Sequence, residues 1–155
     1  ETELAERFAA LDRAVANSRL GETMVPGYHL EGPFLNPTPG YAGCHPAAAM
    51  IPAHPGLIQR LERGLSRPIL LLTLAPEIEG AIETIRWCRA HGIVAAIGHS
   101  ATDLTITQAA ATAGATLSTH LGNALPQPQP KFFNPLMAQL SEDRLTASVI
   151  AASGM

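Results

Sequence analysis

The sequence predicts an α/β fold built around a parallel β-sheet, and three observations support this prediction. Helical and strand-like segments alternate along the chain. The strand-like segments are continuous apolar runs without alternation, which is typical of strands buried on both faces. The chain has 155 residues, of which 46% are hydrophobic and 15% are charged, so it can bury a substantial core and is not disordered.

The first half of the chain predicts two helices separated by an apolar run and a long loop. Residues 1–19 predict a helix, because apolar side chains recur at three- and four-residue steps, and Gly21 ends it. A short apolar run over residues 24–30 leads into a proline-rich loop over residues 35–56. Loops of this length are usually functional or mobile. A short helix over residues 57–65 follows.

The second half predicts the repeating strand and helix units of the sheet. Two buried strands come first, each followed by a helix, and a third strand and a last strand-like run follow. A loop rich in proline and glutamine over residues 126–130 interrupts this order. The predicted strands are 68–74, 93–97, 115–119 and 145–151, and the predicted helices are 77–91 and 103–113.

Composition and charge exclude several classes of protein. The formal net charge is −3, and no basic face emerges, so we expect no nucleic-acid partner. No window of eighteen uncharged apolar residues occurs, so we expect no membrane span. Two cysteines, Cys44 and Cys88, cannot form a disulfide framework. Without a signal peptide at Glu1, a cytoplasmic, reducing location is expected.

Three side chains that can bind a metal follow strands of the predicted sheet. Glu31, His99 and His120 each come just after an apolar run, and the carboxyl ends of parallel strands gather at one face. Two imidazoles and a carboxylate suit Zn²⁺ or Fe²⁺ and leave a position for water. Such a metal lowers the pKa of its water toward roughly 7 and can polarise a carbonyl. In the alternative interpretation, each histidine is only a hydrogen-bonded residue.

Four further polar residues are candidates for a role at the site. His45 lies in the proline-rich loop and either contacts a substrate or is exposed. His29 shares a strand face with Glu31 if side chains alternate there, which would place it behind the ligands. Asn123 either orients a ligand or shapes a turn. Lys131 is the only lysine of the chain, and it either meets an anionic group or is exposed.

Five short motifs occur in order along the chain, and together they resemble the N-acetylglucosamine-6-phosphate deacetylases of the amidohydrolase superfamily, in a match that runs from about residue 27 to about residue 150. The combination is specific, because a HLEGPF segment with a later GHS and THLxNA at this spacing rarely arises by chance. The motifs are HLEGPFLNP at 29–37, GCH at 43–45, LAPE at 74–77, GHS at 98–100 and THLGNA at 119–124.

The resemblance implies a fold and an activity. It implies a partial (β/α)₈ barrel, strands three to seven, so that residues 1–155 form one incomplete barrel domain, since a full barrel takes about 250 residues. It also implies a metal-dependent hydrolase of amino-sugar metabolism. Such an enzyme removes the N-acetyl group from N-acetylglucosamine 6-phosphate or a related amino sugar and gives glucosamine 6-phosphate and acetate.

The resemblance also implies roles for individual residues. One divalent metal ion, Zn or Fe, is held by Glu31, His99 and His120. Cys44 stands where the family has alanine, and Lys131 falls near a phosphate-binding residue that is usually arginine, whose bidentate fork a lysine lacks. The residues that the resemblance places at the substrate are Cys44, His45, Asn123, Ala124 and Lys131.

One part of the family's catalytic apparatus has no counterpart here. The family's general acid/base is an aspartate that would lie beyond residue 155, and Asp103, which follows His99 on a helix, cannot replace it. A second hypothesis is therefore a non-catalytic fragment that binds metal or sugar. The strand edges that a partial barrel leaves unpaired also lead us to expect a homo-oligomer.

Overall fold

The computed structural model describes residues 2–151 and contains one five-stranded parallel sheet. Each strand pairs with the next one along the chain, so the order in space is the order in sequence. This arrangement confirms the predicted α/β fold and matches five consecutive strands of a (β/α)₈ barrel. The strands are β1 (Tyr28–Glu31), β2 (Ile69–Leu74), β3 (Val94–Ile97), β4 (Ala115–Ser118) and β5 (Thr146–Ala147).

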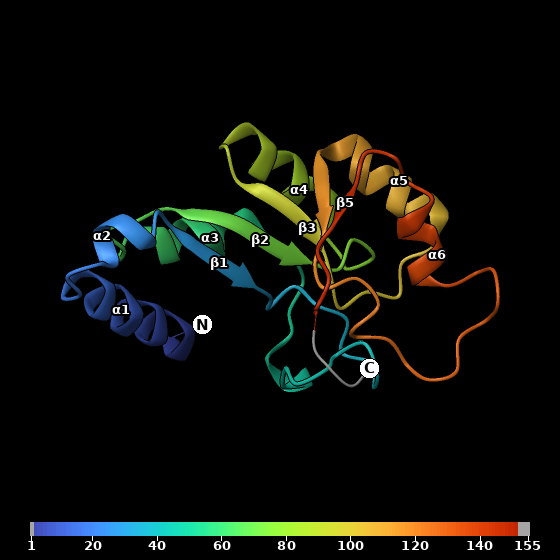
Figure 1. Cartoon of the computed structure of the whole chain (residues 1–155), viewed down its shortest axis with the longest axis horizontal. Helices are drawn as coiled ribbons and strands as arrows, with labels where there is room; N and C mark the ends of the chain where they lie inside the picture. Colours follow the sequence, from blue (N-terminus) through green and yellow to red (C-terminus); the bar gives the residue numbers. More distant parts are fainter. Residues whose placement is uncertain (1, 152–155) are drawn as a thin grey trace.

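Helices precede and connect these strands. Helix α3 packs against α4, α4 against α5, and α5 against α6. Figure 1 shows α1 and α2 beside β1 at one end of the molecule and α5 and α6 at the other, while the strand arrowheads converge on its middle. None of the helices within residues 2–151 is long and apolar enough to cross a membrane. The helices are α1 (Thr2–Ala16), α2 (Gly21–Met24), α3 (Pro55–Glu62), α4 (Ala81–Ala90), α5 (Leu104–Ala113) and α6 (Pro135–Leu140), with a 3₁₀ turn η1 (Ala47–Ala49).

The two faces of the sheet differ in chemistry. One face forms the core together with apolar side chains of the helices, among them Leu57, Ile85 and Cys88. Because side chains alternate along a strand, the other face carries His29 and Glu31 of β1. The sequence had predicted that these two side chains share a face. The strand residues of the core include Leu30, Leu72, Leu74, Ala95, Ile97 and Ala115.

Several predicted helix boundaries were wrong. Helix α1 ends at Ala16 and not at residue 19, and α3 spans Pro55–Glu62 and not residues 57–65. Helix α4 begins at Ala81 and not at residue 77, because the preceding residues form a turn that ends at Gly80 with a left-handed φ of +75°. Only glycine adopts that conformation readily, and a Cβ there would meet the carbonyl of Ala53. Gly21, which was predicted to end the first helix, lies beyond the end of α1 at Ala16 and begins the short helix α2.

The end of the chain also differs from its prediction. Helix α6 was not predicted, although it has a clear start: the side chain of Asn134 accepts a hydrogen bond from the Met137 amide at 2.9 Å, and Pro135 occupies the first position. The run predicted as a strand over residues 145–151 is a strand only at β5, which is two residues long.

Candidate metal centre

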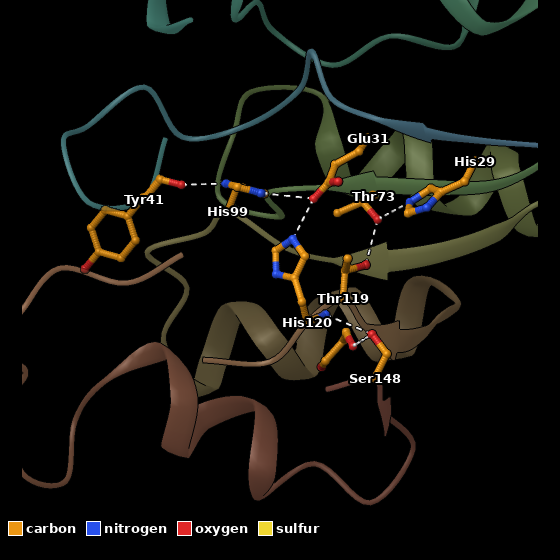
Figure 2. A network of polar contacts seen from close by, with 9 residues as sticks. His29, Glu31, Tyr41, Thr73, His99, Thr119, His120 and Ser148 are labelled. Carbon is orange, nitrogen blue, oxygen red and sulfur yellow. Dashed lines mark hydrogen bonds and ion pairs between the residues drawn. The ribbon is translucent and has the colours of Figure 1, made fainter. Parts of the chain in front are cut away.

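A carboxylate and two imidazoles converge at the carboxyl ends of β1, β3 and β4. Glu31 is the last residue of β1, and His99 and His120 each lie two residues beyond the end of their strand. The Oε1 atom of Glu31 lies 3.0 Å from Nε2 of His99 and 2.8 Å from Nε2 of His120 (Figure 2). The parallel sheet thus brings together the three side chains that the strand ends predicted.

The ring of His99 is held in one orientation. Its Nδ1 lies 2.8 Å from the carbonyl oxygen of Tyr41, and its side chain is only 4% exposed. Because a carbonyl oxygen only accepts hydrogen bonds, Nδ1 carries a proton and donates it to Tyr41. In the neutral ring, this leaves Nε2 with a lone pair that faces Glu31, which is the arrangement of a metal-binding histidine.

Both histidines have an uncommon backbone conformation. The φ angles of His99 and His120 are +51° and +32°, and they are the only residues other than glycine with positive φ among residues 2–151. Each is held by a hydrogen bond at its backbone. The Asn36 amide donates to the His99 carbonyl at 3.0 Å, and the His120 amide donates to Oγ of Ser148 at 2.8 Å. Strained residues of this kind are concentrated at functional sites.

The electrostatics of the cluster keep Glu31 ionised. The hydrogen bond from His99 lowers the pKa of Glu31 to about 2, with His120 adding to the effect and burial opposing it. Burial lowers the pKa of His99, but the contacts with Glu31 and the Tyr41 carbonyl outweigh it and raise that pKa above its ordinary value. The ionised forms of Glu31 and His99 therefore stabilise each other.

His45 joins this cluster from the long loop after β1. Its ring packs edge-on against that of His99, with 4.6 Å between the ring centroids. One ligand atom each from Glu31, His45 and His99 lie within 4.8 Å of one another, so His45 is within reach of a shared metal. Burial is the main cause that lowers the pKa of His45, so its ring is neutral at pH 7.

The donor atoms fit a divalent cation. Ligand atoms bound to Zn²⁺ at about 2.0–2.1 Å lie roughly 3 Å apart, close to the spacing between Glu31 and the two histidine nitrogens. Imidazole and carboxylate ligands suit Zn²⁺ and Fe²⁺. The fixed tautomer of His99 points a lone pair toward the carboxylate, and a cation between them would satisfy both atoms.

The remaining residues predicted at a substrate lie around the cluster at different distances. Ala124 is buried and lies near Gly43, which itself approaches the ring of His99. Cys44, Asn123 and Lys131 are exposed, and within residues 2–151 their side chains make no hydrogen bond or ion pair with the cluster. The ammonium group of Lys131 lies 5.1 Å from the centroid of the Phe132 ring.

A pocket of about 360 Å³ opens beside Glu31 and His45. The start of α1 and the loop after β1 form its walls, with Leu4, Pro33 and Met50 among the apolar side chains that line it. This volume lies in the range of small-molecule sites.

A polar chain on the same face of the sheet was not predicted. Nε2 of His29 lies 2.8 Å from Oγ1 of Thr73, which lies 2.7 Å from Oγ1 of Thr119, the neighbour of His120 (Figure 2). The position of His29 on its strand suggested a place behind the ligands. Its hydrogen-bonded partners Thr73 and Thr119 lie in segments that the sequence indicates only as apolar strands, so this polar chain could not be predicted.

Comparison with known proteins shows what this arrangement is similar to. The chain is 37% identical over 112 residues to N-acetylglucosamine-6-phosphate deacetylase from Bacillus subtilis, covering 72% of this chain and 28% of that protein. It is 36% identical over 133 residues to N-acetylglucosamine-6-phosphate deacetylase from Homo sapiens, covering 84% of this chain and 32% of the relative. The chain resembles a segment of the N-acetylglucosamine-6-phosphate deacetylases. No protein-family model matches it.

A solved structure shares the fold of this segment. The N-acetyl-D-glucosamine-6-phosphate deacetylase of Mycobacterium smegmatis, a mutant in complex with N-acetyl-D-glucosamine-6-phosphate, superimposes with a TM-score of 0.80 at 32% identity. The match covers 96% of this chain and 37% of that one. The chain therefore spans about a third of the length of these deacetylases. The resemblance to them that the motifs indicated is confirmed.

Proposed function

We propose that the protein is a metal-dependent hydrolase that removes the N-acetyl group from N-acetylglucosamine 6-phosphate or a related amino sugar, giving glucosamine 6-phosphate and acetate. The contact of one Glu31 oxygen with Nε2 of both His99 and His120, within 3.0 Å, carries the proposal. It is supported by the similarity to deacetylases, one of which was solved with such a sugar phosphate.

In this proposal, Glu31, His99 and His120 hold one divalent metal ion, zinc or iron. When bound, such an ion supplies Lewis-acid activation of a water molecule and of a carbonyl group. The chain's own contribution is to fix the ligands. The Tyr41 carbonyl keeps the proton of His99 on Nδ1, and the low pKa of Glu31 keeps its carboxylate ionised at every pH at which the protein would work.

The proposed substrate contacts are those of the loops around the cluster. His45 is neutral at pH 7, so one ring nitrogen can donate a hydrogen bond to the acetamide group while the other accepts one. Cys44 contacts the substrate beside His45, Asn123 and Ala124 contact the sugar, and the ammonium group of Lys131 meets the phosphate as a point charge. The pocket beside His45 offers space for one sugar ring.

We also propose a cytoplasmic homo-oligomer. Within residues 2–151, β1 and β5 each pair along one edge only, and unpaired edges favour association with another chain or segment.

One observation favours a second candidate function, a non-catalytic metal- or sugar-binding protein. Asp103 is the acidic residue that follows His99 in sequence, but its side chain caps α5 by accepting a hydrogen bond from the Ile106 amide at 2.8 Å. It is therefore engaged as a helix cap and not offered to a substrate as a general base.

Acetate release from N-acetylglucosamine 6-phosphate, with bound metal measured by elemental analysis, tests the proposal. The expected result is one zinc or iron per chain and acetate release that His120→Asn abolishes. Glu79→Ala is the matched control, because the Glu79 side chain is exposed. A protein that takes up neither metal contradicts the proposal, and one that keeps metal without releasing acetate favours the second candidate.

A further inference from the structure

We propose that Glu77 is the positioning residue of the metal centre, holding His99 in its ligating conformation through two separate loops. The inference rests on the proposed metal site, because Glu77 would act on that site only through the residues to which it is hydrogen-bonded. Glu77 lies three residues after the end of β2, in the turn before α4.

The carboxylate of Glu77 joins the loops that follow β1 and β3. Its Oε1 accepts hydrogen bonds from Nδ2 of Asn36 at 2.9 Å and from the Ala101 amide at 2.6 Å. Its Oε2 accepts from the hydroxyl of Ser100 at 2.6 Å. All three donors are neutral N–H or O–H groups, and hydrogen bonds to a carboxylate are stronger than those between two neutral groups.

The first route to His99 runs through its own turn. Ser100 and Ala101 directly follow His99, and their bonds to Glu77 fix the chain just after the residue with a φ of +51°. The Ser100 hydroxyl also accepts a hydrogen bond from the Thr102 amide at 3.0 Å, in the turn that precedes α5. A left-handed residue persists only where its surroundings over-determine it, and these bonds do so.

The second route runs through the loop after β1. Asn36, which Glu77 holds by its side chain, donates its amide to the His99 carbonyl at 3.0 Å. Its Oδ1 accepts from the Thr38 amide at 2.9 Å, and the Thr38 carbonyl accepts from the Tyr41 amide at 3.1 Å. The Tyr41 carbonyl in turn holds Nδ1 of His99. One carboxylate therefore supports both the backbone and the ring of the ligand.

Residues that orient a ligand affect metal binding more than overall stability. Loss of such a partner costs about 10- to 100-fold in metal affinity. We therefore expect Glu77→Ala to weaken Zn²⁺ binding by about 10- to 100-fold and to alter the visible spectrum of the Co²⁺-loaded protein. Glu77→Gln retains an acceptor oxygen and regains most of the affinity. Glu79→Ala, which removes an exposed carboxylate two residues away, leaves both readouts unchanged.

The deciding measurement combines Zn²⁺ affinity by chelator competition with the NMR resonance of the His99 Nδ1 proton in metal-free protein. In wild type that proton is bonded to Tyr41 and should give a protected resonance, and in Glu77→Ala we expect this resonance to be lost. If Glu77→Ala does not fold, Ser100→Ala removes the bond to Oε2 together with the bond from the Thr102 amide, leaves both bonds to Oε1, and should weaken Zn²⁺ binding to a smaller extent.

Unchanged Zn²⁺ affinity together with an unchanged His99 resonance in either variant would overturn the inference. A wild-type protein that takes up no metal would contradict the proposed function instead. In that case the His99 resonance still decides the role of Glu77, because it needs no metal.

Discussion

Gly98 is the position at which a single methyl group should disturb both the fold and the metal centre. It directly precedes His99, and a Cβ there would lie 2.5 Å from Cγ2 of Thr73 and 3.3 Å from Cβ of Thr119. Thr73 is completely buried, and its hydroxyl bonds both His29 and Thr119. The clash can be relieved only by rotating Thr73 and breaking these bonds, or by moving the turn that carries His99.

The expected cost of Gly98→Ala follows from overpacking. Extra methyl groups in packed interiors cost about 1–3 kcal/mol, and we take about 2 kcal/mol here. An unfolding entropy of about 2.1 cal/mol/K per residue converts this into a fall in Tm of about 6 °C. Thermal unfolding by circular dichroism measures the shift, and Zn²⁺ titration measures the weaker binding. Gly64→Ala is the control, since its nearest neighbour would lie at 3.7 Å. A Gly98→Ala protein that melts and binds Zn²⁺ like wild type would refute the reasoning.

Three further predictions concern the same centre. Ser148→Ala removes the acceptor of the His120 amide, so Zn²⁺ affinity should fall about tenfold, whereas Ser141→Ala at the end of α6 should leave it unchanged in the same competition titration. Acidification should weaken metal binding progressively, because protons compete for the imidazole of His99, whose pKa is raised, while Glu31, with a pKa of about 2, stays ionised; affinity that is constant down to pH 4 would contradict this. Zn²⁺ at a free concentration of about 100 times its Kd should stabilise the folded protein by about 2.7 kcal/mol. Removing it with a chelator should therefore lower Tm by about 8 °C, and an unchanged Tm would mean that no metal binds the folded state.

The sheet and the convergence of its strand ends could be predicted because both depend on local patterns. Apolar runs between helical segments predicted the strands, and parallel strands bring their carboxyl ends together whatever the loops do. Glu31, His99 and His120 follow those ends closely, so their meeting required no knowledge of the loops. The helix α6 could have been found from Asn134 and Pro135, but the surrounding prolines and glutamines masked that signal.

The loop residues of the site could not be placed in advance. His45 reaches His99 only through the path of the long loop after β1, and no short-range pattern encodes that path. The same holds for Tyr41, whose carbonyl selects the tautomer of His99, because every residue has a carbonyl and the sequence cannot single one out. Glu77 lay at a strand end like the ligands, yet its partners come from two other loops.

Zinc binding to wild type and to His99→Ala and His120→Asn variants tests the central claim most directly. Elemental analysis after equilibration with Zn²⁺ should show one ion per wild-type chain. X-ray absorption should show two imidazole nitrogens and a carboxylate oxygen at about 2.0–2.2 Å. Either variant should lose the ion. A wild-type chain without zinc, or variants that retain it with unchanged ligands, would contradict a metal centre at the carboxyl ends of β1, β3 and β4.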